Sequence, residues 1–165
     1  MSTQRPLTGI GTRLRHLLDL LETDLASVYP RLGLDGYRPR FSPVIRALVA
    51  HGPSTIKELA GAMRVTHSAA SQTVAQLARR GLVELSVGRD ARQRVVRLTG
   101  RGEELLPVLD VEWAIAERAT ADLDAELSVP LARLLGELER ALERRPFRER
   151  VAEATEALAG RDVPA

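Results

Sequence analysis

The sequence predicts a mainly α-helical protein with one small β-hairpin. Leucines recur at helical spacing near both ends, over residues 8–29 and 131–142. Two short segments between residues 55 and 80 carry helix-capping signals. Strict alternation of apolar and polar residues occurs only within 83–98. A length of 165 residues corresponds to about one domain, so we expect a single domain over 1–165.

The first predicted helix covers about residues 8 to 29 and ends at Pro30. Its apolar face is formed by Leu14, Leu17, Leu18, Leu21, Leu25 and Val28. Glycine and proline at 33–39 predict a connecting loop. A second helix begins at Ser42-Pro43, with serine as the N-cap and proline in the first helical position. Gly52-Pro53 ends this helix.

Two further short helices follow, about four residues apart. Thr55 and Glu58 have the spacing of a capping box, which opens the first of them. Thr66 can cap the second, which runs to Arg80 and is stopped by Gly81. Two short helices with so brief a connection indicate a helix-turn-helix.

A β-hairpin is predicted directly after the helix-turn-helix. Its strands are residues 83–87 and 95–98, and the polar segment 88–94 forms the tip. A hairpin in this position is a wing, so residues 42–100 are expected to form a winged helix-turn-helix.

The C-terminal third is predicted to be helical. Thr99 can cap a long helix, which Pro107 either kinks or leaves intact. A further helix starts at Ser128 and Pro130 and ends at Pro146. Residues 151–158 can form a last helix. The leucine stripes are too long for the winged domain to cover, so 8–30 and 101–160 are expected to be dimerisation helices of an obligate homodimer.

Several classes of function are excluded by what the sequence lacks. Without cysteine, the chain has no disulfide, thiolate nucleophile or zinc ribbon. P-loop, HExxH, GxSxG and complete dinucleotide motifs are missing, so we expect neither an enzyme nor a cofactor. Three histidines on three different predicted helices do not indicate a metal site. No apolar run approaches the ~20 residues of a membrane span, and a polar N-terminus predicts a cytoplasmic protein.

The charge is unevenly distributed. The net charge is only +2, yet residues 64–101 carry eight arginines against two acidic residues. Residues 102–165 carry eight arginines against fifteen acidic residues. A basic block in a nearly neutral chain indicates a local anionic partner.

The predicted second helix of the helix-turn-helix has the composition of a DNA-reading helix. Its first turns contain Thr66, His67, Ser68, Ser71 and Gln72, and no charged residue occurs from 67 to 78. Hydroxyls suit phosphates and base edges, and glutamine can bond adenine with both amide atoms. The alternative is an ordinary solvated face, but such faces usually carry Glu and Lys.

The predicted wing tip adds a second candidate contact. Arg89, Arg92 and Arg94 surround Asp90. An arginine on such a tip can enter a narrow minor groove, and one aspartate can orient its guanidinium group. The alternative is a solvated basic turn.

Four segments together resemble the MarR (multiple antibiotic resistance regulator) family. They are Thr55-Ile56-Lys57-Glu58-Leu59-Ala60, residues 66–77, Asp90-Ala91-Arg92 and Leu98-Thr99-Gly100-Arg101-Gly102. The resemblance covers about residues 8–145. It implies a dimeric winged-helix transcription regulator, usually a repressor of nearby genes, that binds palindromic double-stranded DNA operators. Asp90 and Arg92 match the family's wing pair, and 66–72 with Gln76 match the recognition helix.

The resemblance also implies release by a small phenolic or anionic aromatic ligand, bound between the dimer helices and the winged lobe. The family has no fixed pocket motif, so location and chemistry alone suggest His16, Tyr29, Tyr37, Arg46 and Trp113, and for each of them packing is favoured over ligand contact. Two alternatives stay open: a DNA-binding protein without an effector, and a helical protein-interaction module with a degenerate winged domain.

Overall fold

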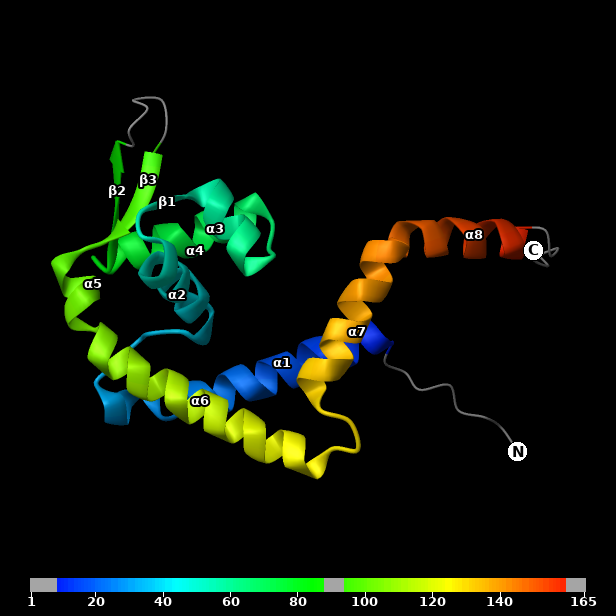
Figure 1. Cartoon of the computed structure of the whole chain (residues 1–165), viewed down its shortest axis with the longest axis horizontal. Helices are drawn as coiled ribbons and strands as arrows, with labels where there is room; N and C mark the ends of the chain where they lie inside the picture. Colours follow the sequence, from blue (N-terminus) through cyan, green and yellow to red (C-terminus); the bar gives the residue numbers. More distant parts are fainter. Residues whose placement is uncertain (1–8, 88–93, 160–165) are drawn as a thin grey trace. The chain divides into compact units, whose positions relative to one another are not determined.

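The computed structural model describes residues 9–87 and 94–159. The chain divides into two compact units, Met1–Ala114 and Ile115–Ala165. The first unit holds the predicted helix-turn-helix and its hairpin, followed by the start of a long helix (Figure 1). The predicted mainly helical fold with a small β-wing is therefore confirmed.

Helix α1 (Ile10–Ala26) forms where the leucine spacing predicts it, but it ends three residues earlier than expected. The chain then passes through two short 3₁₀ turns, η1 (Tyr29–Leu32) and η2 (Pro39–Phe41). Gly33 and Gly36 both have positive φ, which glycine adopts without steric cost, so they turn the chain between η1 and η2.

The helix-turn-helix consists of α3 (Ile56–Met63) and α4 (His67–Arg79). The capping box is present: the Glu58 N–H donates to Thr55 Oγ1 (3.2 Å), and the Thr55 N–H donates to Glu58 Oε2 (2.7 Å). These bonds favour the carboxylate and lower the pKa of Glu58. Thr66 caps α4 as expected, since its Oγ1 accepts the Ala69 N–H at 3.2 Å.

Helix α2 (Ser42–His51) begins at the predicted position by a different mechanism. Ser42 is not its N-cap, and no side chain caps the helix. The Ser42 hydroxyl instead donates to Glu112 Oε2 (3.3 Å) and pairs with the Tyr37 hydroxyl (3.3 Å). The capping expectation is therefore wrong, because a buried carboxylate from a distant helix binds this hydroxyl.

The wing is a three-stranded antiparallel sheet in the order β1-β3-β2. Strands β2 (Val83–Val87) and β3 (Arg94–Leu98) form the predicted hairpin, with Val83 opposite Leu98. Strand β1 (Ser54–Thr55) was not predicted, because two residues are too few to show alternation. It pairs with β3 and immediately precedes α3.

The core of the first unit lies between α2, α3, α4 and the sheet. Its fully buried side chains include Phe41, Val44, Ile45, Leu59, Val74, Leu77, Val96 and Leu109. The apolar face of α4 packs into this core, so the opposite face of the helix is exposed.

The predicted long helix after Thr99 is divided in two. Thr99 caps α5 (Gly100–Glu104), and Leu106 begins α6 (Leu106–Glu126) beside Pro107. Gly102 is buried against Leu82, where a β-carbon would lie 2.2 Å from the Leu82 carbonyl oxygen.

The second unit contains the end of α6, α7 (Leu131–Arg144) and α8 (Phe147–Ala159). The N-cap of α7 is Pro130, and Asp124 Oδ1 accepts the Leu131 N–H at 2.9 Å, so Ser128 does not cap this helix. No described residue of α7 or α8 is buried in the single chain, and Leu134, Leu135 and Leu138 are about half exposed.

Within the described ranges, none of the helices combines the length and apolarity that crossing a membrane requires.

Candidate nucleic-acid interface

The exposed face of α4 collects the residues predicted to contact DNA. Thr66, His67, Ser68 and Gln72 are exposed, and Ser71 and Gln76 are half-buried. The opposite face, with Ala70, Val74 and Leu77, is buried in the core. The helical period therefore places a polar, uncharged strip outward along the first three turns of α4.

Of the DNA-contact residues predicted on the wing, the structure describes one. Arg94 is exposed at the start of β3, opposite Val87. Arg89, Asp90 and Arg92 lie outside the described residues. At the base of the hairpin, Arg97 binds Glu84 through Nε (2.6 Å) and Nη2 (2.5 Å), a cross-strand ion pair between residues that are also backbone partners.

An arginine cluster adjoins the C-terminal half of α4. Arg40 Nη2 donates to Gln76 Oε1 at 2.6 Å. A cavity of about 450 Å³ beside this bond is lined by Arg38, Gln76, Arg79 and Arg80. Sequence reasoning missed this cluster, because its members come from the loop before α2 and from the end of α4. The only available signal was the density of arginine in both segments.

Two of the predicted ligand residues lie in the core. Tyr29 and Tyr37 are 2% and 6% exposed, and the Tyr29 hydroxyl donates to Glu112 Oε1 at 3.1 Å. Burial raises the pKa of Tyr29, and the neighbouring Glu112 carboxylate raises it further. Burial also raises the pKa of Tyr37. Glu112 is itself 1% exposed, so α6 is joined to η1 and α2 by a buried hydroxyl–carboxylate network.

The other three predicted ligand residues are Arg46, Trp113 and His16. The Arg46 guanidinium group lies over the Trp113 ring, 4.4 Å from its centroid. The Trp113 indole nitrogen is buried and has no hydrogen-bond partner among the described residues. His16 is exposed on α1.

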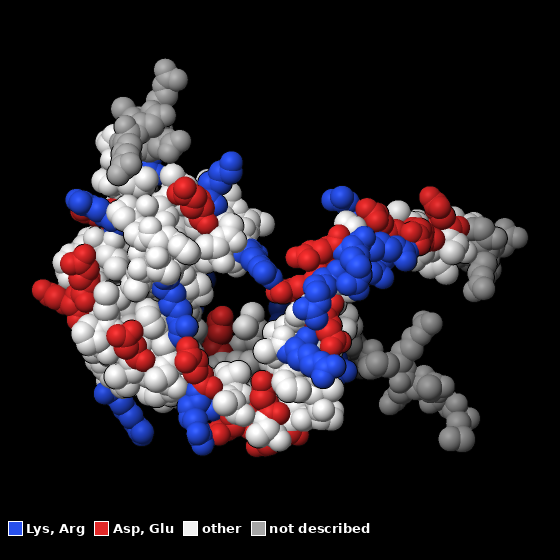
Figure 2. Space-filling model, in the orientation of Figure 1, with Lys and Arg blue, Asp and Glu red and all other residues white. Residues whose placement is uncertain are grey.

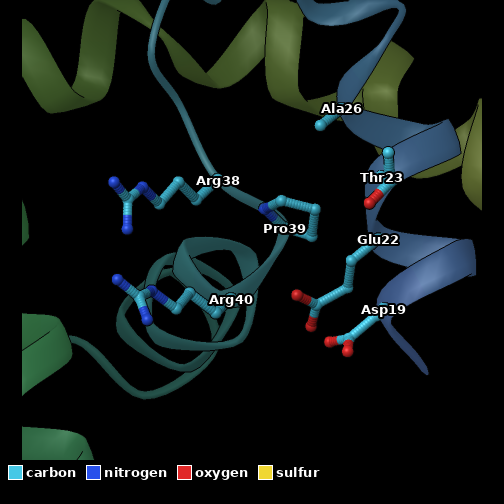
Figure 3. Close-up of a pocket in the computed structure, with 7 residues that line it drawn as sticks. All are labelled: Asp19, Glu22, Thr23, Ala26, Arg38, Pro39 and Arg40. Carbon is cyan, nitrogen blue, oxygen red and sulfur yellow. The ribbon is translucent and has the colours of Figure 1, made fainter. Parts of the chain in front are cut away.

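A different cavity lies between α1 and η2. It measures about 310 Å³ and is lined by Asp19, Glu22, Thr23, Ala26, Arg38, Pro39 and Arg40. Figure 3 shows both carboxylates pointing into it from α1, whereas the Arg38 and Arg40 guanidinium groups extend away from them. None of the five predicted ligand residues lines this cavity.

Charges of both signs alternate over the second unit. Figure 2 shows arginine and carboxylate side chains interleaved along α7 and α8. Arg133 pairs with Glu137 at 3.1 Å, and Arg145 pairs with Glu153. This surface therefore lacks the one-sided positive charge of a nucleic-acid contact.

Within the described part of the chain, no group of three or more His, Cys, Asp or Glu residues could hold a metal ion.

Solved structures of transcription regulators share this fold. The PcaV regulator from Streptomyces coelicolor, solved with its natural ligand, is 20% identical (TM-score 0.64) over 88% of this chain and 99% of its own. The MepR–DNA complex from S. aureus is 17% identical (TM-score 0.64) over 83% and 98%. MOSR of M. tuberculosis, also solved with DNA, is 19% identical (TM-score 0.65) over 83% and 98%. At these identities the likeness establishes the winged-helix fold.

A sequence comparison adds to this. Residues 39–93 match the sequence model of the MarR family, a segment that contains α2, the helix-turn-helix and β2. Among curated proteins, no relative matches significantly. The matched segment, about a third of the chain, is therefore similar to the winged domain of MarR-family regulators. The match supports a DNA-binding transcription regulator.

Proposed function

We propose that the protein is a homodimeric repressor that binds a palindromic DNA operator near its own gene. The observation that carries this is the outward face of α4. Six polar, uncharged side chains point away from the core there, and the Thr66 cap orients the first turn. The amino end of a helix attracts phosphates, and short hydroxyl and amide groups suit base edges.

The wing supports the same proposal. Arg94 is exposed at the start of β3, and the family match includes Asp90 and Arg92, which lie outside the described residues. In this arrangement α4 enters the major groove and the Arg92 guanidinium enters the adjacent minor groove.

Repression is tested in the source organism by transcript counts of the genes beside this one. Deleting the gene raises at least one neighbouring transcript, and the intact gene supplied elsewhere restores repression. An operator-binding protein whose deletion lowers the neighbouring transcripts is an activator, which would contradict repression and leave DNA binding intact.

We further propose that a small aromatic or anionic effector binds beside Arg46 and Trp113 and lowers DNA affinity. The buried indole N–H lacks an acceptor among the described residues, and an unmet buried donor costs about 1–3 kcal/mol. A carboxylate or carbonyl oxygen on a ligand would meet it. The cavity of Figure 3 is a poorer place for an anion, because Asp19 and Glu22 point into it.

Trp113 is the only tryptophan, so its fluorescence reports this site without labelling. A panel of aromatic acids that begins with salicylate is titrated against the free and the DNA-bound protein. A ligand that weakens DNA binding tenfold binds about tenfold more weakly to the complex, a coupling of ~1.4 kcal/mol. Equal affinity in both states, or no binding by any acid, favours a regulator without an effector.

A further inference from the structure

The cavity beside the C-terminal half of α4 is lined by three arginines and one glutamine. Arg38, Arg79 and Arg80 contribute guanidinium groups and Gln76 contributes an amide, and none of the described residues that line the cavity has a carboxylate. Arg38 and Arg79 are exposed, whereas Gln76 and Arg80 are half-buried. Three guanidinium groups gathered in one cavity suit a group with several charged oxygens.

The bond from Arg40 decides which end of the Gln76 amide is available. A guanidinium group has donors and no acceptor, so Gln76 must present its carbonyl oxygen to Arg40, as the 2.6 Å contact shows. The amide nitrogen is then the end that does not contact Arg40. Reading adenine requires both ends, and the oxygen would have to accept from Arg40 and from the base at the same time, with one lone pair for each.

The cluster is also held in place before any partner arrives. The Arg80 guanidinium carbon lies 5.8 Å from the centre of the Phe41 ring. The Arg80 guanidinium group also packs closely against Gly36, where a β-carbon would lie 2.9 Å from its two terminal nitrogens. Figure 3 shows the Arg38 and Arg40 guanidinium groups turned away from the two α1 carboxylates.

We propose that Arg38, Arg79, Arg80 and the Gln76 amide nitrogen form a phosphate-binding site, with Arg40 as the positioning residue that makes Gln76 a donor. The proposal rests on the proposed function, since the phosphate it takes is a backbone diester of bound DNA. It changes the role of one residue: Gln76 contacts the backbone, and base reading is left to the first turns of α4.

The carboxyl end of a helix disfavours an anion, and α4 ends at Arg79. This effect is weaker than a charge-assisted hydrogen bond, so two such bonds from the arginines outweigh the helix end.

The first experiment measures how DNA affinity depends on salt. Arg38→Ala and Arg79→Ala are compared with Arg31→Ala, which removes the same charge from an exposed position on η1 outside this cavity. The DNA is a duplex selected from random sequence by the wild type. Each cavity variant lowers the slope of log affinity against log salt by about one per protomer, and Arg31→Ala leaves it unchanged.

The second experiment asks whether Gln76 reads sequence. Gln76→Ala lowers affinity for the selected duplex and for an unrelated duplex by the same factor, so their ratio stays constant. Gln76→Glu lowers both further, because a carboxylate repels the phosphate. Loss of preference at one A·T pair in Gln76→Ala would overturn the donor assignment.

Calorimetry with inorganic phosphate at fixed ionic strength separates the two sources of the phosphate group. Phosphate binding that Arg79→Ala abolishes, together with an unchanged salt slope, supports the site but makes its ligand a free phosphate. Arg38→Ala and Arg79→Ala variants that match Arg31→Ala in both assays overturn the site. A wild type that binds no duplex overturns the proposed function instead, and phosphate calorimetry still tests the cavity.

Discussion

Among the described glycines, Gly102 has the least room for an added β-carbon. The Leu82 carbonyl that faces it also accepts the Thr99 N–H at 3.1 Å, so this oxygen cannot move without breaking the start of α5. A β-carbon 2.2 Å from such an oxygen has no room.

We therefore expect Gly102→Ala to lower the free energy of unfolding by about 1–3 kcal/mol, the usual cost of overpacking. Gly100→Ala is the matched control, because its β-carbon meets nothing within 4 Å in the same helix. The control gains up to about 1 kcal/mol from helix propensity. Urea unfolding of both variants checks this, and equal stability of the two would contradict the contact.

The buried tyrosines make a prediction about alkaline pH. Tyr29 and Tyr37 both have raised pKa values in the folded protein, so they keep their protons when unfolded tyrosine, with a pKa of 10.0, loses its own. The unfolded state then binds fewer protons than the folded state, and stability falls as pH rises above that value. Below it, this contribution is fully present.

The test is the urea midpoint between about pH 8 and about pH 11. These are the only two tyrosines in the chain, so no other tyrosine contributes to the fall in stability with pH. Tyr37→Phe removes one titrating group and flattens the decline. An identical decline in wild type and Tyr37→Phe would contradict the burial of Tyr37.

At the level of elements, the sequence predicts what is encoded within a few residues. The Thr55–Glu58 box, the Thr66 cap and the β2–β3 alternation all act locally, and all appear in the structure. Ser42 shows the limit: its hydroxyl bonds to Glu112, 70 residues away, and no local pattern reports that. The Arg40–Gln76 bond was missed for the same reason.

The wing makes its own prediction. Arg92→Ala weakens operator binding strongly and makes the salt slope shallower by about one per wing, because a minor-groove arginine also releases counterions. Asp90→Ala acts in the same direction by leaving Arg92 unoriented. Fluorescence anisotropy at several salt concentrations measures both. Wild-type binding by Arg92→Ala at physiological salt would remove the wing from the interface.

For the whole molecule, the exposed leucines predict a dimer. Leu14, Leu17, Leu18 and Leu21 on α1 are each about half exposed, as are Leu134, Leu135 and Leu138 on α7. Stripes of this kind are unstable in water unless a second surface covers them. A two-fold pair would cover both stripes and present two α4 helices to DNA.

Sedimentation of the wild type at micromolar concentration is expected to show a dimer. Leu138→Glu places a charge in the α7 stripe and shifts the equilibrium to monomer. Arg140→Gln changes the net charge by the same amount on the opposite side of α7, so it stays dimeric. A wild type that sediments as a stable monomer would contradict the dimer.

Sequence-specific binding to DNA is the claim on which the other proposals depend. Selection of duplexes from a random pool, followed by anisotropy titration at fixed salt, tests it directly. We predict enrichment of a palindrome with half-sites about 10 bp apart, one helical turn, bound at least ~10³-fold tighter than a scrambled duplex of equal length. A pool without enrichment, and equal affinity for selected and scrambled duplexes, would contradict the assignment.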